Sequence, residues 1–320
     1  MKTPRFWYDR PGLLSFVLSP LSLLYGIGAA AKRCAAAPYK AKVPVICIGG
    51  IVAGGSGKTP TALEIARLLI EQRHKPVFVT RGYGGSEEGP LKVDAACHTS
   101  ADVGDEALLL ARAAPVWVGR DRAAAIREAE KEATHIILDD GFQNTSVRPD
   151  ISLLTIDSEA GIGNGMLLPA GPLRETFCGA MHRATAVVLI GGRDPHRLAS
   201  RVECPLLCAK YEPRLPDGFP REAKFFAFAG IARPEKFYQT CRDSGLRLAA
   251  TRDFADHHAF NAAELAMLAQ DAQNFGARLL TTEKDWVRLP PDFRAQVMVL
   301  PVTLAFEDSG KVKQLLSSLN

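Results

Sequence analysis

The chain has 320 residues, of which 47% are hydrophobic and 23% are charged, a composition that fits one large or two modest globular domains and excludes long disorder. The formal net charge of +4 comes from the N-terminal end, where residues 1–42 hold seven lysines and arginines against Asp9 alone. The remaining chain is slightly acidic, so its charge balance gives no reason to expect a nucleic-acid partner.

One long apolar stretch, LLSFVLSPLSLLYGIGAAA, occupies residues 13–31. It is short for a membrane span, which needs about 20 apolar residues, and Pro20 predicts a break in it. Its basic flanks and the aromatic residues Phe6, Trp7 and Tyr8 favour a helix that lies in the headgroup region of an anionic membrane. A helix packed on the protein's own core and a true span are the alternatives. A signal peptide conflicts with the phosphate loop that follows.

From residue 43 onward, short apolar runs alternate with amphipathic runs. This alternation of strands and helices is typical of βαβ units and a mostly parallel sheet. Strands are expected at residues 43–49, 76–80, 115–119, 135–139, 151–157, 185–191 and 205–210. Helices are expected between them at residues 59–73, 105–114 and 122–132.

Proline, glycine and charged residues dominate residues 211–224, which predicts a linker. After it, strands are expected at residues 225–231, 246–254, 278–282 and 296–302, with helices that begin near residues 234 and 261. We therefore expect an α/β fold with a phosphate-loop (P-loop) domain at 43–210, a smaller C-terminal α/β domain at 211–320 and an N-terminal interfacial segment at 1–42.

The stretch GGIVAGGSGKTP, residues 49–60, resembles a phosphate loop but carries Val52 where the usual pattern has its first glycine. A strand, a glycine-rich turn and a helix N-terminus are all expected here, and backbone N–H groups form the phosphate cradle in such loops. Lys58 is expected to meet the β- and γ-phosphates, and the Thr59 hydroxyl is expected to face Mg²⁺. We conclude that the chain binds a nucleotide.

A second carboxylate-bearing strand end, HIILDDGFQ at residues 135–143, places Asp139 and Asp140 directly after apolar positions. One carboxylate at the carboxyl end of a strand can hold the Mg²⁺ water shell opposite Thr59. The alternative is a solvated turn before Gly141.

Four further stretches have both a structural and a functional interpretation. Asp105 and Glu106 follow Gly104 at the head of a helix, where carboxylates cap as readily as they catalyse. Arg81 and Tyr83, in RGYGG, follow a strand at its ligand-binding end. The other two stretches are DFADHHAF at residues 253–260, a surface pair of histidines or a metal site, and LPAGPLRE at residues 168–175, an exposed turn or a phosphate clamp. The cysteines are scattered without a CxxC pair and are interpreted as reduced thiols of a cytosolic protein.

Taken in order, eight motifs resemble the tetraacyldisaccharide 4′-kinase family: GGIVAGGSGKTP, TRGYGG, VGDEALLL, VGRDR, LDDGFQ, LPAGPLRE, FADHH and TTEKD. The resemblance covers nearly the whole chain. It implies an ATP- and Mg²⁺-dependent phosphotransferase that phosphorylates the lipid A disaccharide precursor, tetraacyldisaccharide 1-phosphate. It also implies a peripheral or monotopic enzyme on the cytoplasmic face of the bacterial inner membrane. Two positions depart from the family, Asn144 where histidine is frequent and Gly50 where asparagine is usual.

By position in these motifs, Asp105 is expected to act on the acceptor hydroxyl and His257 is expected to be its partner from the second domain, with Lys58 as the third catalytic residue. Arg174 and Glu175 are expected to contact the substrate. The resemblance further implies a nucleotide site made of Val52, Ala53, Gly54, Gly55, Ser56, Gly57, Lys58, Thr59, Tyr83 and Arg120. It implies Mg²⁺ ligands among Thr59, Glu106, Asp139, Asp140 and Gln143.

Two other classes of function remain open from the residues. One is a P-loop ATPase or GTPase that acts as a switch or a metal-insertion factor, with Cys204 and Cys208 or the two histidines as ligands. No NKxD-type guanine signature supports it, and TEKD at residues 282–285 is a weak echo. The other is a nucleotide-binding membrane scaffold without catalysis, which the set of Lys58, Thr59 and Asp139 disfavours.

Overall fold

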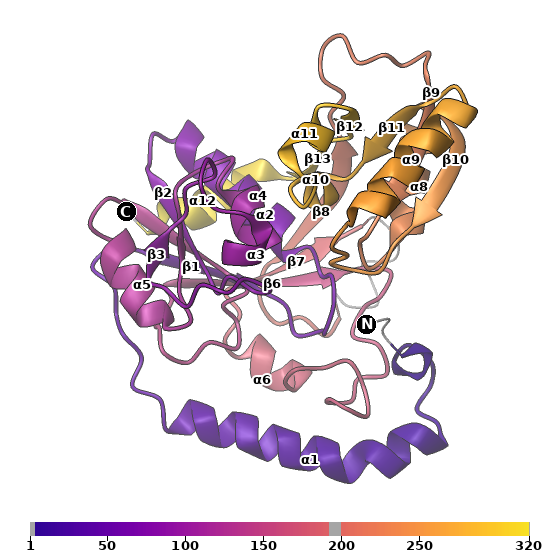
Figure 1. Ribbon diagram of the computed structural model, residues 1–320. Coiled ribbons are helices and arrows are strands. Elements are labelled where there is room, and N and C mark those ends of the chain that lie inside the picture. Colours follow the sequence, from indigo (N-terminus) through magenta and orange to yellow (C-terminus); the bar gives the residue numbers. More distant parts are fainter. Residues whose placement is uncertain (1–3, 192–199, 320) are drawn as a thin grey trace. The chain divides into compact units, whose positions relative to one another are not determined.

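The computed structural model describes residues 4–191 and 200–319 and contains two compact units (Figure 1). The larger unit holds the described residues up to 211 and those from 304 onward, and the smaller unit holds residues 212–303. The sequence-based boundaries had placed 211–320 in one domain. The structure differs because the last helix, α12 (Ser309–Ser317), buries Val312 and Leu316, and because the Glu307 N–H donates to the Cys208 carbonyl at 2.9 Å.

The larger unit is built on a sheet of nine strands among the described residues, in the order β13-β8-β7-β6-β1-β5-β2-β4-β3. Every strand pair from β8 to β4 is parallel, whereas the short β3 runs antiparallel to β4. At the other edge, the backbone hydrogen bonds from Arg214 N–H to the Pro301 carbonyl and from Glu307 N–H to the Cys208 carbonyl make β13 antiparallel to β8. The strands are β1 (Val45–Gly49), β2 (Pro76–Thr80), β3 (Leu91–Lys92), β4 (Val116–Val118), β5 (His135–Asp139), β6 (Ile151–Asp157), β7 (Ala186–Ile190), β8 (Leu206–Pro213) and β13 (Val302–Phe306). The expected mostly parallel sheet is confirmed.

Helices cover both faces of this sheet. The central strands are buried at every position, which explains why they appear in the sequence as continuous apolar runs rather than alternating ones. Helix α5 packs through its alanines and Ile126 on one face, and the other helices follow the strands in βαβ order. Besides α5 (Arg122–Ala129), these are α2 (Lys58–Glu71), α3 (Ser100–Val103), α4 (Asp105–Leu110) and α6 (Phe177–Met181).

The single strand expected at residues 296–302 is two strands in the structure. Strand β12 (Val297–Val299) belongs to the smaller sheet and β13 to the larger one. Pro301 separates them, because a proline has no N–H to donate to a ladder, and its carbonyl accepts from the Arg214 N–H at 2.9 Å.

The smaller unit has a four-stranded parallel sheet in the order β10-β9-β11-β12. Aromatic residues dominate its core, with Phe225 and Phe228 fully buried on opposite faces of β9. Its strands are β9 (Lys224–Ala229), β10 (Arg247–Asp253), β11 (Arg278–Thr281) and β12, and its helices are α8 (Pro234–Asp243), α9 (Ala262–Asn274), α10 (Glu283–Trp286) and α11 (Pro291–Arg294). A smaller α/β unit is thus present, as the fold class requires.

Helix α1 (Leu13–Cys34) follows a short 3-10 turn, η1 (Arg5–Trp7), and runs without interruption through Pro20. The predicted break at this proline is wrong for a local reason. Proline cannot donate to the carbonyl four residues earlier, which here is that of Phe16, and the Ser19 hydroxyl donates to that carbonyl instead at 2.7 Å. The helix therefore continues for 22 residues.

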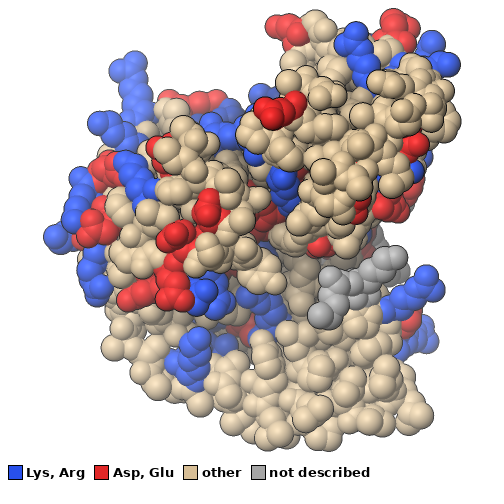
Figure 2. Space-filling model, viewed as in Figure 1, with Lys and Arg blue, Asp and Glu red and all other residues tan. Residues whose placement is uncertain are grey.

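The polarity of α1 is inverted relative to a helix of a soluble protein. The residues that α1 buries are Ser15 and Ser22, whereas its large apolar side chains are exposed, among them Leu13, Leu14, Phe16, Val17, Leu21, Leu23, Leu24 and Ile27. Figure 2 shows the surface over α1 as almost free of charged side chains. By length and composition α1 is able to cross a membrane, with a mean hydropathy of 1.8, and the same criteria find no second such helix among the described residues.

Polar contacts hold the inner side of α1 to the loop between β6 and α6. The Ser22 hydroxyl donates to the Leu167 carbonyl at 2.8 Å and accepts from the Ala170 N–H at 3.0 Å. The Asn164 amide lies 3.3 Å from the Ser15 hydroxyl, and the Trp7 indole donates to the Pro169 carbonyl at 3.0 Å. These contacts fix α1 against the larger unit while its apolar side stays uncovered.

Candidate active site

The phosphate loop lies at the carboxyl end of β1, at the point where the sheet changes its winding direction. Chain connections from β1 proceed toward β2 on one side, whereas the connection from β5 to β6 passes to the other side of β1. Ligands of open α/β sheets bind outside the carboxyl ends of strands at such a point. Gly57, the residue directly before α2, has a φ of 78°, and a Cβ there would lie 2.3 Å from the Ile190 side chain. Only glycine fits this position.

Val52 stands at the loop position where the usual pattern has glycine, and its side chain is buried in the core. It forms an isolated bridge with Leu173 and packs in a cluster that includes Leu154 and Ile162. The next residue, Ala53, donates its N–H to the Pro172 carbonyl at 2.8 Å. The start of the loop is thus anchored by apolar packing, and the glycines that bend the loop come later, at Gly54 and Gly57.

The two loop side chains that the sequence singled out meet the two aspartates that follow β5. The Lys58 ammonium lies 3.3 Å from Asp140 Oδ1, and the Thr59 hydroxyl donates to Asp139 Oδ2 at 3.2 Å. Strands β1 and β5 are adjacent and parallel, so their carboxyl ends bring these four residues together. The carboxylate expected opposite Thr59 corresponds to Asp139, whereas the contact between Lys58 and Asp140 was not predicted.

The two aspartates have opposite electrostatic environments. Burial raises the pKa of Asp139 to about 7, and the negative charges of Glu106 and Asp140 act in the same direction. Burial also acts to raise the pKa of Asp140, but the cations of Lys58 and Arg174 outweigh it and leave that pKa below its usual value. The protein's own cations therefore neutralise the charge of Asp140. The ionised form of Asp139 lacks such compensation, so a bound cation would stabilise it more.

Gln143 offers an unsatisfied oxygen to this site. Its amide nitrogen donates to the Gly50 carbonyl at 3.0 Å and to Glu175 Oε1 at 2.9 Å, which fixes the orientation of the amide. Its Oε1 is buried and has no hydrogen-bond partner among the described residues. Such an atom suits a cation or a water bound to one. No group of three acidic, histidine or cysteine side chains with metal-binding geometry occurs in the described ranges.

Arg174 and Glu175 are engaged with the site's own residues. Arg174 Nη1 donates to Asp140 at 3.0 Å. The Glu175 side chain is almost fully buried, and it forms ion pairs with Arg183 and, at 3.8 Å, with Arg33 from the last turn of α1. The pair thus connects the Asp139–Asp140 turn to α1.

Asp105 and Glu106 form the first turn of α4. Asp105 is buried, and its Oδ1 accepts from the Glu106 N–H at 3.0 Å, so the carboxylate does satisfy a backbone group of the helix start. Glu106 is one of the charges that raise the pKa of Asp139. The capping and catalytic interpretations therefore both remain compatible with the position of Asp105.

Tyr83 and Arg120 are both surface residues. The Tyr83 side chain is exposed, and the Arg120 guanidinium forms a 2.6 Å ion pair with Glu88 on the surface. Asn144, the departure from the family, accepts from both the N–H and the hydroxyl of Ser146 at 3.0 Å and so closes a local turn.

His257 belongs to the smaller unit, where it has the left-handed φ of 58°. Its Nε2 lies 3.1 Å from the Lys284 ammonium, and its Nδ1 lies 3.4 Å from Arg288 Nη2. His258 has a separate role, because its ring stacks on Phe254 and its Nε2 lies 2.9 Å from Glu264.

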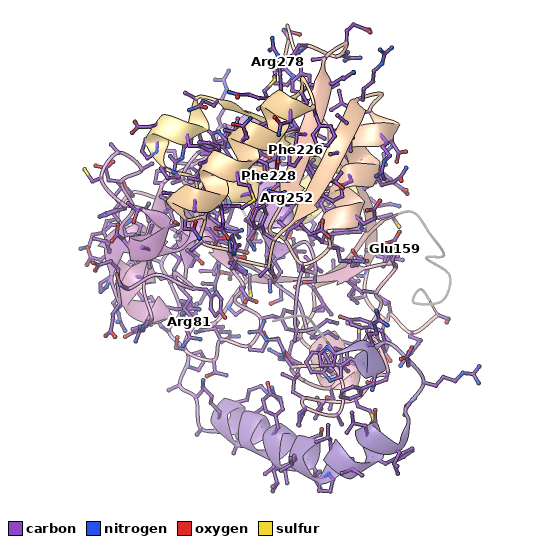
Figure 3. The ribbon with its side chains drawn as sticks, turned by 45° about the vertical axis from the view of Figure 1, so that its right-hand side comes forward. Arg81, Glu159, Phe226, Phe228, Arg252 and Arg278 are labelled. Atoms are coloured by element: carbon purple, nitrogen blue, oxygen red, sulfur yellow. The ribbon has the colours of Figure 1, made fainter. Side chains whose placement is uncertain are left out.

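Arg122 is a residue that the sequence analysis missed, although it stands in the VGRDR motif. Its side chain is buried, its Nη1 donates to the Gly119 and Arg120 carbonyls at 3.2 Å, and its Nε has no partner in the described part of the chain. Burial and the charge of Arg81, which is labelled in Figure 3, lower the pKa of this guanidinium, whereas the charges of Asp140 and Asp139 oppose the shift. A buried arginine that interacts electrostatically with both aspartates is a candidate for phosphate contact. Its burial gave no signal in the sequence.

Comparison with known proteins agrees with this geometry. The family described as tetraacyldisaccharide-1-P 4′-kinase matches residues 14–320. The chain belongs to this family. The resemblance noted from eight motifs is thereby confirmed.

Individual relatives extend over nearly the full length. A tetraacyldisaccharide 4′-kinase of Parvibaculum lavamentivorans is 47% identical over 301 residues, which cover 90% of this chain and 87% of the relative. One of Rhodospirillum centenum is 44% identical over 327 residues, which cover 100% and 97%. A crystal structure of the "apo" form of LpxK from Aquifex aeolicus in complex with ATP has a TM-score of 0.79 at 26% identity and covers 96% of this chain and 99% of its own.

Proposed function

We propose that this protein is an ATP-dependent lipid kinase that transfers the γ-phosphate of ATP to the 4′-hydroxyl of tetraacyldisaccharide 1-phosphate, forming lipid IVA. The observation that carries the proposal is the meeting of Lys58 with Asp140 and of Thr59 with Asp139 beside a phosphate loop, in a chain of the 4′-kinase family. In the reaction the acceptor oxygen forms a bond to the γ-phosphorus, the bond from that phosphorus to the β,γ-bridging oxygen breaks, and the hydroxyl proton leaves to a base.

The nucleotide site is proposed to be the loop from Val52 to Thr59. Backbone N–H groups of the loop and the start of α2 favour the negative charge of the phosphates. Lys58 would exchange Asp140 for the β- and γ-phosphates and neutralise charge on the bridging oxygen. Tyr83 and Arg120, both exposed, are proposed as additional nucleotide contacts at the edge of the site.

Mg²⁺ is proposed as the cation that accompanies ATP. Suitable ligands, directly or through water, are Thr59, Asp139 and the Gln143 oxygen that has no hydrogen-bond partner among the described residues. Glu106 and Asp140 add negative charge close to Asp139. Mg²⁺ uses one or two protein carboxylates and keeps several waters, so the site does not need three clustered acidic groups. The cation would neutralise phosphate charge, while the protein residues hold it at the strand ends.

Asp105 and His257 are proposed to act on the acceptor hydroxyl. Asp105 would accept the proton, and the imidazole of His257 would orient the carboxylate and share the charge that develops. They belong to different compact units, so the proposal requires the two units to cooperate during turnover, and closure on ATP would limit wasteful hydrolysis. Arg174 and Glu175 are proposed to contact the substrate and Arg122 to contact a transferring phosphate.

The acceptor's acyl chains call for a membrane-bound reaction. The outward apolar side of α1 and the basic residues at its ends, including Lys32 and Arg33, support interfacial binding to an anionic leaflet. We place the protein at the cytoplasmic face of the inner membrane, where ATP is available, as a peripheral or monotopic enzyme.

The decisive experiment measures ATP consumption with and without tetraacyldisaccharide 1-phosphate, followed by the mass of the lipid. We expect acceptor-dependent ADP release and one added phosphate, and a loss of several kcal/mol of transition-state stabilisation in a folded Lys58→Ala variant. Acceptor-independent hydrolysis would favour a switch ATPase. Nucleotide binding without turnover would favour a scaffold. Full activity of Lys58→Ala would overturn the kinase proposal.

A further inference from the structure

Of the TTEKD motif at residues 281–285, only Lys284, which contacts His257, has entered the site described so far. In the smaller unit its last residue, Asp285, is fully buried at the start of α10. Asp285 Oδ2 accepts from the Thr282 hydroxyl at 2.7 Å and from the Gly230 N–H at 3.1 Å. A buried carboxylate that accepts hydrogen bonds from both a side-chain hydroxyl and a backbone N–H is held in a fixed position.

Arg288 is the ion-pair partner of Asp285. Its side chain is 5% exposed, and its Nη1 donates to Asp285 Oδ1 and to the Gly230 carbonyl, both at 2.9 Å. The pair therefore holds the N–H and the C=O of the same glycine. A buried ion pair whose members are both hydrogen-bonded has a fixed geometry, and the planar guanidinium presents its remaining N–H groups in fixed directions.

Those remaining groups reach His257. The Gly230 carbonyl that Arg288 holds also accepts from the His257 N–H at 3.2 Å. Arg288 Nη2 itself lies 3.4 Å from His257 Nδ1. Arg288 therefore contacts His257 at two points, through the backbone by way of Gly230 and directly at the ring. This explains how a non-glycine residue is kept at a φ of 58°, a conformation that costs free energy unless its surroundings fix it.

We propose that Arg288, oriented by Asp285, is a positioning residue that sets the tautomer and the orientation of the His257 ring. A guanidinium only donates, and a neutral imidazole has one acceptor nitrogen, so the contact makes Nδ1 the acceptor and puts the proton on Nε2. This inference rests on the proposed function of His257, because an Nε2–H group is the one that can donate to a catalytic carboxylate such as Asp105.

Lys284 competes for the same ring, since its ammonium lies 3.1 Å from Nε2 and also only donates. The two contacts require opposite tautomers, so only one of them is a hydrogen bond to a neutral imidazole. The shorter distance favours Lys284. The fixed guanidinium favours Arg288, because its orientation is already held by Asp285 and Gly230 and less entropy is lost on binding, whereas the half-buried lysine has a flexible stem. Because Arg288 is the partner with the fixed position, we infer that its contact with Nδ1 is the hydrogen bond to the neutral ring.

The test is nitrogen NMR of the full-length protein labelled at histidine, with the His257 signals identified by their loss in His257→Gln. We expect Nδ1 of His257 to be unprotonated and Nε2 to carry the proton near neutral pH. In Arg288→Met we expect the tautomer populations to change and kcat to fall by roughly tenfold or more, with KM for ATP changed less than about twofold. Arg288→Lys should recover little of the lost kcat and of the wild-type tautomer population, because a lysine side chain lacks the planar guanidinium.

Arg252→Met is the matched control. Arg252 lies in the same smaller unit, pairs with Asp271 at 2.7 Å and sits over the ring of Phe226 (Figure 3). This variant loses a partly buried arginine contact but should leave the His257 signals and kcat unchanged. If Arg288→Met does not fold, the wild-type spectrum and Arg288→Lys carry the test.

A proton on Nδ1 in the wild type, or His257 signals and kcat in the Arg288 variants that equal those of the control, would overturn the positioning role. Failure of the proposed function looks different. In that case the wild-type protein shows no acceptor-dependent turnover, while the tautomer measurement still reports on the contact between Arg288 and His257.

Discussion

Asp139 is the residue whose protonation most directly couples this site to pH. Its pKa of about 7 lies above the ordinary aspartate value because burial and the charges of Glu106 and Asp140 favour the neutral form. A group with a raised folded-state pKa stabilises the fold fully below its unfolded pKa near 4, and this stabilisation is lost as the pH rises through about 7. Without a bound cation, the buried carboxylate at pH 8 therefore destabilises the protein.

We predict that Asp139→Asn abolishes this part of the pH dependence. The unfolding free energy of the variant, measured by urea denaturation without nucleotide or Mg²⁺, should rise relative to the wild type between pH 5 and pH 8. The upper limit is a few kcal/mol, since each pKa unit corresponds to about 1.4 kcal/mol. The same variant should bind ATP with Mg²⁺ more weakly, because a neutral amide replaces a carboxylate ligand. A stability difference that stays constant over this pH range would show that Asp139 is ionised throughout.

Gly50, where the family usually has asparagine, has a steric explanation in the structure. A Cβ at this position would lie 2.3 Å from the Ser56 hydroxyl, which is buried and 3.0 Å from the Thr155 hydroxyl. Glycine at residue 50 leaves room for this pair of hydroxyls behind the phosphate loop. The sequence showed that this position departs from the family, but the side chains that a Cβ would meet could be found only in the three-dimensional structure.

Among the elements, α1 carries the membrane proposal on one side and is held to the protein on the other. We predict that replacing Leu13, Phe16 and Leu24 with glutamine leaves the fold intact, because all three side chains are exposed, while it weakens binding to anionic vesicles. Activity on bilayer substrate should fall, and activity on detergent-dispersed substrate should be retained.

The control for α1 replaces Met267 and Phe275, two exposed apolar residues of the smaller unit, with glutamine. Vesicle sedimentation should be unchanged in this control. Equal sedimentation of the α1 variant and the wild type would mean that another surface is the anchor. A loss of folding in the α1 variant would mean that this side of the helix packs on protein after all.

How far the sequence predicted each element depended on whether the signal was local. The strands β1, β5 and β6 and the phosphate loop were predicted because apolar runs and glycine spacing are local patterns. The continuation of α1 through Pro20 was not, because it depends on the Ser19 hydroxyl satisfying one carbonyl. The division of residues 296–302 between two sheets was missed for the same kind of reason, since no local pattern tells which sheet a strand joins.

The candidate site divided in the same way. Lys58, Thr59 and Asp139 were recognised from motifs, and their contacts follow from the parallel pairing of β1 and β5. Arg122 and Arg288 were missed because an arginine becomes informative only when it is buried beside particular partners, and burial of a charged residue is a property of the tertiary structure.

At the scale of the whole molecule, two compact units contribute residues to one proposed reaction, Asp105 from the larger and His257 from the smaller. If the two residues act as a unit on the acceptor hydroxyl, loss of either removes the same step. We predict that Asp105→Ala and His257→Ala each lower kcat strongly, and that the double variant loses little more than the more damaging single one. KM for ATP should change little, because the phosphates are held by the loop beginning at Val52.

The measurement is a double-mutant cycle on kcat and kcat/KM with detergent-dispersed acceptor, which removes any effect of membrane binding. His258→Ala is a useful companion to His257→Ala, because His258 is the adjacent residue, its ring stacks on Phe254 and its Nε2 lies 2.9 Å from Glu264. It should cost stability more than kcat. Strictly additive losses in the cycle would show that Asp105 and His257 act in separate steps, and unchanged kcat in His257→Ala would leave Asp105 to act without help from the smaller unit.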